Sequence, residues 1–100
     1  MLNMKLINRD TVGELKLIGR LDTNTAADAE ASMVEVVNRF DNLILNLEEL
    51  EYVSSAGLRA LKRAHIAMRR KGGSLAVKGV NKPVMEVFQI TGFAGMLKFI

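Results

Sequence analysis

Two adjacent serines, Ser54 and Ser55, are the residues whose type and position suggest chemistry in this chain. They stand between an apolar run and a segment of helical periodicity, and Ala56 and Gly57 follow them. Serine is a preferred N-cap residue, so Ser54 is predicted to cap a helix and Ser55 to lie in its first turn. The first N–H groups of a helix lack intrahelical acceptors and carry a partial positive charge. Ser55 is therefore predicted to offer its hydroxyl where a phosphoryl group is favoured.

The same serines also have a purely structural interpretation. Serine before a helix is common, because its side chain satisfies one of the N–H groups that the helix leaves unpaired. Spacing alone leaves both interpretations of Ser54 and Ser55 open, a modified site and a plain cap.

A buried strand and a helix are predicted to position these serines. Leu43–Leu47 is nearly all apolar, as expected of a strand covered on both faces, and the acidic Glu48–Glu51 returns the chain to water. After the serines, residues that share one side of a helix recur at helical spacing: Leu58, Leu61, Ala64, His65 and Met68. The strand should therefore deliver Ser55 to an edge of the sheet, at the start of a helix.

The N-terminal part of the chain predicts a hairpin. Lys5–Asn8 and Glu14–Ile18 alternate partly between apolar and polar residues, and the turn-forming segment 10–13 separates them. Gly19 is predicted to break the second strand.

A helix is predicted to follow the loop that contains Asp22, Asn24 and Thr25. Thr25 and Asp28 have the spacing of a capping box. The following apolar stripe indicates core packing: Ala26, Ala29, Met33, Val36, Val37 and Phe40. Helix capping alone would explain the residue types in the loop.

The rest of the chain predicts alternating strands and helices. Gly72 and Gly73 end the helix that follows Ser55, Ser74–Val77 is a candidate strand, Asn81–Pro83 starts another helix, and 96–100 allows a short last strand. Strands that alternate with helices imply right-handed crossovers. We therefore predict one α/β domain over residues 1–100, with a mixed, mainly parallel sheet of four to five strands and helices packed mainly against it.

Composition excludes several classes of function. The chain has no cysteine and a single histidine, so no disulfide framework or unaided zinc site is predicted, and we expect neither a metal nor a cofactor. Charged residues interrupt the apolar N-terminus before a signal peptide or a membrane span is complete, which predicts a cytoplasmic protein without membrane association.

The positive charge is concentrated in one predicted helix. The chain has a net charge of +3, but six of its fourteen cations lie in the segment 59–71, which has no acidic residue. On a helical wheel Arg59, Lys62 and Arg63 share one face with Arg69, Arg70 and an apolar residue, Ile66. Such a face is often merely solvated, but an apolar residue ringed by cations is also typical of an interface for an acidic protein. The scarcity of aromatic residues argues against direct nucleic-acid binding.

Enzymatic chemistry at the serines is not expected. Val53–Gly57 approaches the glycine-x-serine-x-glycine elbow of hydrolases, but Val53 replaces the first glycine. His65 lies ten residues further along the same helix, roughly 15 Å from Ser55 by helical rise, so it cannot act as the base for that serine. Gly72 and Gly73 lack the spacing of phosphate-binding loops, and no small-molecule substrate is indicated.

Three segments together resemble the STAS family of anti-sigma factor antagonists. They are Gly19–Ala26, Leu45–Leu58 and Gly72–Leu75, and they occur in the order expected of that family. The resemblance implies that Ser55, two residues before Gly57, is the phosphoacceptor. Many members carry aspartate before the acceptor, where this chain has Ser54.

The resemblance also implies a function and partners. The unphosphorylated protein would bind an anti-sigma factor, typically a serine kinase, and so release a sigma factor; phosphorylation of Ser55 would end this binding, and a serine phosphatase would restore it. The resemblance also implies that Asp22 and, to a lesser degree, Asn24 and Thr25 lie near the phosphosite and take part in partner contact. The alternative is a STAS interaction subunit of a signalling or transport assembly that is not controlled by phosphorylation.

Overall fold

A long N-terminal hairpin forms one side of the sheet. The computed structural model describes residues 1–100, and β1 (Leu2–Arg9) pairs antiparallel with β2 (Val12–Leu21) around a turn in which Asp10 has φ of 63°. Aspartate tolerates this left-handed conformation better than most residues. The hairpin is confirmed, and both strands extend beyond the predicted segments.

The sequence predicted that Gly19 would break the second strand, but β2 continues past Gly19. Its φ is +109°, and the pairing register shifts between Gly19 and Arg20, so the strand continues past the irregularity to Leu21. A Cβ at Gly19 would lie 2.4 Å from the carbonyl oxygen of Met1, which explains why the shift occurs at a glycine.

The shift lets β2 pair with two strands in succession. Its first half runs parallel to β3 (Asn42–Asn46), and its last residues run parallel to β4 (Leu50–Val53). β4 was not predicted from the sequence, because Glu48–Glu51 suggested an exit to solvent. Leu50 and Val53 are in fact buried, while Glu51 and Tyr52 are exposed. The sheet therefore has six strands.

Helical crossovers connect the remaining strands. The helices are α1 (Ala26–Arg39), α2 (Ser55–Arg70) and α3 (Lys82–Ile90), with a short 3-10 turn, η1 (Phe93–Met96). The strands β5 (Ser74–Lys78) and β6 (Lys98–Phe99) complete the order β1-β2-β3-β5-β6, with all pairs parallel except β1 with β2. The predicted α/β class and mainly parallel sheet are confirmed.

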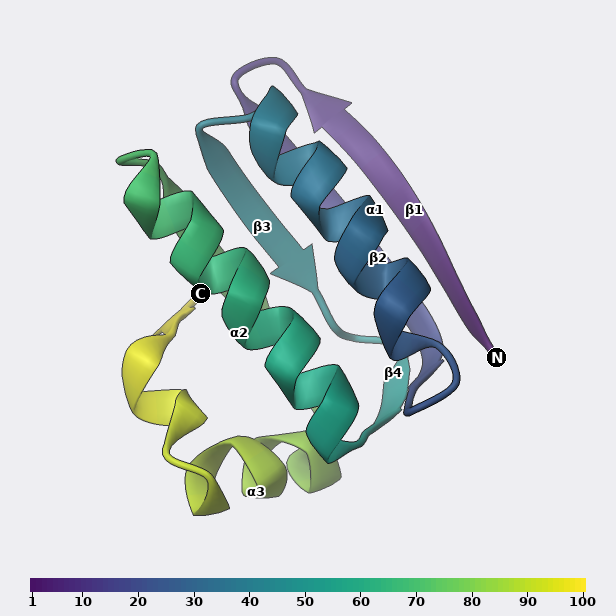
Figure 1. Ribbon diagram of the computed structural model, residues 1–100. Coiled ribbons are helices and arrows are strands. Elements are labelled where there is room, and N and C mark those ends of the chain that lie inside the picture. The colour runs from purple at the N-terminus through teal and green to yellow at the C-terminus, as the bar shows by residue number, and fades with distance from the viewer.

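One face of the sheet carries the core. In Figure 1, α1 and α2 lie side by side across the sheet, and α3 lies at the end where β4 finishes. The core cluster contains 23 buried residues, among them Leu17, Leu43 and Leu45 from the sheet and Met33 and Met68 from the helices. Burying a side chain of this size stabilises the fold by about 1.5 to 3 kcal/mol. None of the helices is both long enough and apolar enough to span a bilayer.

Candidate functional site

The ends of β2 and β4 bring two loops together. Leu21 and Val53 are direct partners in this parallel pair, and the Ser54 N–H donates a hydrogen bond to the Leu21 carbonyl at 2.9 Å. Because the carboxyl ends of parallel strands meet at one edge of a sheet, the loop that follows Leu21 starts beside the serine pair. The structure therefore brings Asp22 and Ser54 close along the backbone.

The two serines have separate roles in the local structure. Ser54 has an extended backbone, and its Oγ accepts a hydrogen bond of 3.1 Å from the Gly57 N–H. This confirms Ser54 as the N-cap of α2. Ser55 is the first residue of the helix, its side chain is exposed, and its hydroxyl makes no hydrogen bond of its own. The free hydroxyl therefore belongs to Ser55.

Gly57 lets the first turn of α2 approach β2. A Cβ at this position would lie 2.5 Å from the Leu21 carbonyl oxygen and 2.7 Å from the Leu21 Cγ. A side chain would thus displace the start of α2 or the end of β2. Gly57 fixes the distance between the two loops, and Ala56, half-buried, lies between it and Ser55.

Asp22 and Thr25 organise the neighbouring loop. Asp22 Oδ1 accepts hydrogen bonds from the backbone N–H groups of Asn24 at 3.0 Å and Thr25 at 3.2 Å, while Thr25 Oγ1 donates to the Arg20 carbonyl at 3.0 Å. The predicted capping box is wrong, since Thr25 has no side-chain cap bond and its backbone is helical. The Asp22 side chain instead forms an Asx turn with the N–H groups of Asn24 and Thr25, which precede the helix.

The same contacts affect the ionisation of Asp22. Burial opposes ionisation most strongly, but the hydrogen bonds from Asn24 and Thr25 outweigh it, so the pKa of Asp22 is lowered. Asp22 therefore remains a carboxylate near neutral pH. No hydrogen bond joins it to Ser55, and Asn24 is exposed. The structure brings these residues to one edge without linking their side chains to the hydroxyl.

A hollow of about 300 Å³ lies between the N-terminal halves of α1 and α2. Its lining comes from both helices and the preceding loop: Thr23, Ala26, Ala27, Glu30, Ala56, Arg59 and Arg63. Ala56 is the neighbour of Ser55, and Arg59 lies one helical turn after Ser55 on the same side of α2. The hollow is therefore lined by the first turns of α2 that follow Ser55, including the cation Arg59, while Ser55 itself is not part of the lining.

The contribution of α1 to this hollow was not predicted from the sequence. Arg63 Nη1 lies 2.8 Å from Glu30 Oε1, so this cation is held by α1. The only signal in the sequence was the spacing of Glu30 from Ala26 and Ala27, which places all three near one side of a helix. Nothing in the sequence indicated which side of α2 would pack beside these α1 residues.

The α2 basic face is exposed as the helical wheel predicted. We use this name for Arg59, Lys62, Arg63, Ile66, Arg69 and Arg70. Ile66 is 39% exposed, Lys62 is half-buried and the four arginines are exposed. The face is therefore available, with Ile66 as its apolar member.

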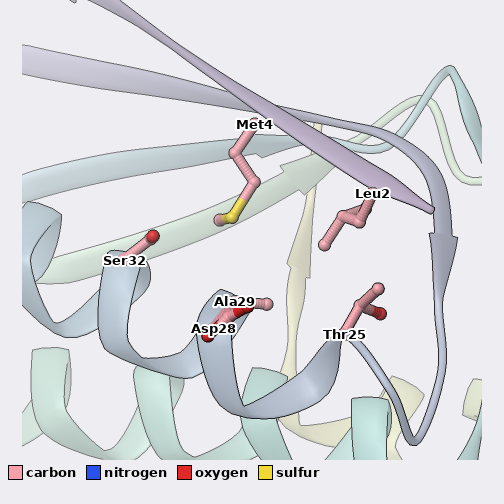
Figure 2. A pocket seen from close by; sticks show the side chains of 6 residues that line it. All are labelled: Leu2, Met4, Thr25, Asp28, Ala29 and Ser32. Atoms are coloured by element: carbon pink, nitrogen blue, oxygen red, sulfur yellow. The ribbon is translucent and has the colours of Figure 1, made fainter.

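A second hollow lies on the other side of α1. It has a volume of about 220 Å³, and Figure 2 shows Leu2 and Met4 of β1 directed toward the side of α1 that carries Ala29. Its polar lining comes from Thr25, Asp28 and Ser32, and no residue of α2 contributes to it. It therefore lies between β1 and α1 and shares only the loop residue Thr25 with the Ser55 edge.

His65 lies on the buried side of α2. It is 6% exposed, and both ring nitrogens lack a hydrogen-bond partner. Burial, followed by the charge of Arg69, lowers its pKa. Its distance from Ser55 along the helix prevents a direct serine and histidine pair.

Comparisons of the sequence with known proteins identify a matching family and a related protein. The family model described as STAS domain matches residues 3–100. An anti-sigma F factor antagonist of Paenibacillus polymyxa is 30% identical over 80 residues, which are 78% of this chain and 68% of that protein.

Solved structures share the fold. The crystal structure of an anti-sigma factor antagonist from Mycobacterium paratuberculosis has a TM-score of 0.88 and 20% identity, and the match covers 99% of this chain and 85% of that one. The Bacillus cell fate determinant SpoIIAA in its phosphorylated form has a TM-score of 0.73 and 17% identity, with 100% of this chain and 91% of that one covered.

Proposed function

Because the chain belongs to the STAS domain family, we propose that it is an anti-sigma factor antagonist whose binding is switched by phosphorylation of Ser55. The unphosphorylated protein binds an anti-sigma factor that is also a serine kinase, and this releases a sigma factor. Phosphorylation ends the binding and a serine phosphatase restores it. In this role the protein is a regulatory binding module and not an enzyme.

The free hydroxyl of Ser55 is the observation that carries this proposal. It is exposed at the start of α2, whereas the neighbouring Ser54 hydroxyl is engaged in the cap. In the reaction, Ser55 Oγ forms a bond to the γ-phosphorus of ATP, the bond to the β,γ-bridging oxygen breaks, ADP leaves, and the kinase accepts the hydroxyl proton. The helix N-terminus favours the resulting anion.

The α2 basic face supports the proposed partner contact. Arg59, Lys62 and Ile66 are accessible on the element that begins with Ser55, so one partner surface can cover both the switch and the face. Arg63 contributes through its pair with Glu30 at the rim of the hollow. An acidic partner surface would match this charge.

Phosphorylation with the partner kinase and ATP tests the acceptor. We expect one phosphoryl group on Ser55, none on Ser55→Ala, and unchanged labelling of the control Ser32→Ala, which alters a half-buried serine of α1. Peptide mapping that places the label on Ser54 would overturn the assignment. The Ser54→Ala variant should weaken the cap by about 1 kcal/mol but still accept the phosphoryl group.

A further inference from the structure

The face of the sheet opposite α1 and α2 carries a second concentration of positive charge. The helices cover one side of the sheet in Figure 1, and the strand residues that alternate with the core point to the other side. We call this other side the open face. Away from the shifted end of β2, its cations are Lys5, Arg9, Lys16, Lys78 and Lys98. At that end Arg20 stacks on Tyr52 and lies 3.9 Å from Asp22, so it is already engaged. Five cations on one face are nearly as many as the six of the segment 59–71.

The pairing register places these cations in order. Lys5 lies directly opposite Lys16, and the next partners in the same row are Asn46 and Lys78. Like charges placed opposite each other on neighbouring strands destabilise a sheet. A surface selected only for solubility would mix positive and negative side chains. The row of Lys5, Lys16, Asn46 and Lys78 has no acidic residue, so its charge calls for another explanation.

The carboxylates of the open face do not balance its cations. Glu14 is 4% exposed, and its carboxylate is enclosed by Asn46 Nδ2 at 3.0 Å, Arg9 Nε at 3.1 Å and Lys78 Nζ at 3.5 Å. The hydrogen bond from Asn46 lowers the pKa of Glu14 more than burial raises it, so the group stays charged. Glu49 pairs with Lys16 at 3.2 Å. Five cations thus meet two carboxylates, and the surplus faces solvent.

Aliphatic side chains form the centre of the open face. Ile7, Glu14, Ile44 and Ala76 follow one another in the row beside the lysine row, and Ile18 lies on the same side of β2. The isoleucines and Ala76 are half-buried, and no aromatic side chain lies in this centre. One tyrosine, Tyr52, lies on this side at the end of β4, and Arg20 covers its ring at 4.3 Å. Base stacking on a sheet requires aromatic side chains, so the composition fits a polypeptide better than a nucleic acid.

We propose that the open face is a docking surface for an acidic polypeptide segment in which carboxylates alternate with aliphatic side chains. The carboxylates of the bound segment pair with Lys5, Lys78 and Lys98, and its aliphatic side chains pack on Ile44. Lys5 and Lys98 have no carboxylate within ion-pair distance in the chain, so they are free to bind a partner. This surface is independent of Ser55 and of the α2 basic face, so the domain holds two partners at once.

Binding of a labelled peptide of alternating glutamate and valine tests the proposal. Fluorescence anisotropy should show salt-sensitive binding to the full chain, and NMR should place the amide shifts on β1, β2, β3 and β5. Lys5→Glu with Lys98→Glu should weaken binding by at least about tenfold. The control Arg39→Glu with Lys82→Glu makes the same change in net charge at exposed positions of α1 and α3, outside both basic surfaces, and should leave affinity within about twofold. Equal losses in the two double variants would overturn the proposal.

Two further experiments test the chemistry of the ligand that binds the open face. Ile44→Thr keeps the β-branched shape. It should lower the affinity for the glutamate–valine peptide and leave the affinity for a glutamate–serine peptide unchanged. A single-stranded oligonucleotide should not displace the valine peptide; displacement with shifts on the same strands would assign the face to nucleic acid instead. Circular dichroism melts confirm that each variant is folded. Phosphorylation of Ser55 should not change the peptide's affinity, which separates this test from that of the proposed switch.

Discussion

At the residue scale, the Ser55 site depends on groups that touch neighbouring backbone. Ser54 caps α2, Asp22 organises the adjacent loop, and Gly57 permits the close approach of α2 to Leu21. These residues place the hydroxyl without contacting it. Substitutions at such positions should therefore affect folding and switching together, while changes at Ser55 should affect switching alone.

Gly57→Ala should destabilise the domain by about 1 to 3 kcal/mol, because the added methyl group would lie 2.5 Å from the Leu21 carbonyl oxygen. Gly95→Ala is the matched control, since nothing lies within 4 Å of a Cβ there. Its effect should stay within about 0.5 kcal/mol. Urea melts of the two variants provide the comparison, and equal effects would contradict a packing role for Gly57.

His65 should make the domain less stable in mild acid. Its pKa is lowered in the folded chain from 6.5, so the unfolded chain binds the proton more readily. The stability is complete above pH 6.5 and declines as the pH falls below it, by at most about 1.4 kcal/mol per pH unit.

His65→Leu should remove this dependence. Both ring nitrogens lack partners in the fold, so the apolar replacement should leave stability at pH 7 equal or higher. Urea melts between pH 7.5 and 5.5 measure both effects. An unchanged slope in His65→Leu would assign the acid sensitivity to other groups.

At the element scale, α2 combines a buried side, a switch residue and a partner face. Its buried residues pack against the sheet and α1, whereas the α2 basic face points outward. Because a helix is rigid over its length, a partner on Ile66 is held at a fixed distance from Ser55. This arrangement lets one phosphoryl group control a larger interface.

Ile66→Glu should weaken binding of the anti-sigma factor by more than about 2 kcal/mol if Ile66 is the apolar anchor of that interface. Folding stability should change by less than about 0.5 kcal/mol, since Ile66 is 39% exposed. Val34→Glu is the control, because Val34 is 41% exposed on α1. If calorimetric titration showed unchanged affinity for Ile66→Glu, the α2 basic face would be a solvated surface and not the partner interface.

At the scale of the whole molecule, the switch should act on the interface and leave the fold unchanged. A phosphate adds about −1.5 to −2 charges, and a helix N-terminus favours this by roughly 0.3 to 1 kcal/mol. Glu48 and Glu51 oppose it, but both are exposed and screened by salt. A partner surface pressed against the dianion would instead meet several kcal/mol of desolvation and repulsion.

Ser55→Asp should therefore keep its free energy of unfolding within about 1 kcal/mol of the wild type while losing part of its affinity for the anti-sigma factor. The loss should be smaller than that caused by phosphate, because a carboxylate carries less charge. Denaturant melts and partner titration must be measured on the same preparation. Weak binding that arises from an unfolded Ser55→Asp protein would contradict this mechanism.

The sequence alone determined the features that depend on neighbouring residues. The cap by Ser54, the three helices and the hairpin follow from hydrogen-bonding types and apolar periods within a few residues. The position of Ser55 at the start of α2 belongs to this group, as does the exposure of Ile66. Resemblance to a known family added the expected role of Ser55.

Only the tertiary structure decided which distant residues meet. The pairing of β2 with β4 past Gly19, the ion pair between Arg63 and Glu30, and the lysine row of the open face all join segments far apart in the chain. Strand register and helix placement depend on how every element packs at once, so no local pattern specifies them. For this reason the sequence located the hydroxyl, while the fold supplied the hollow between α1 and α2 and the second basic surface.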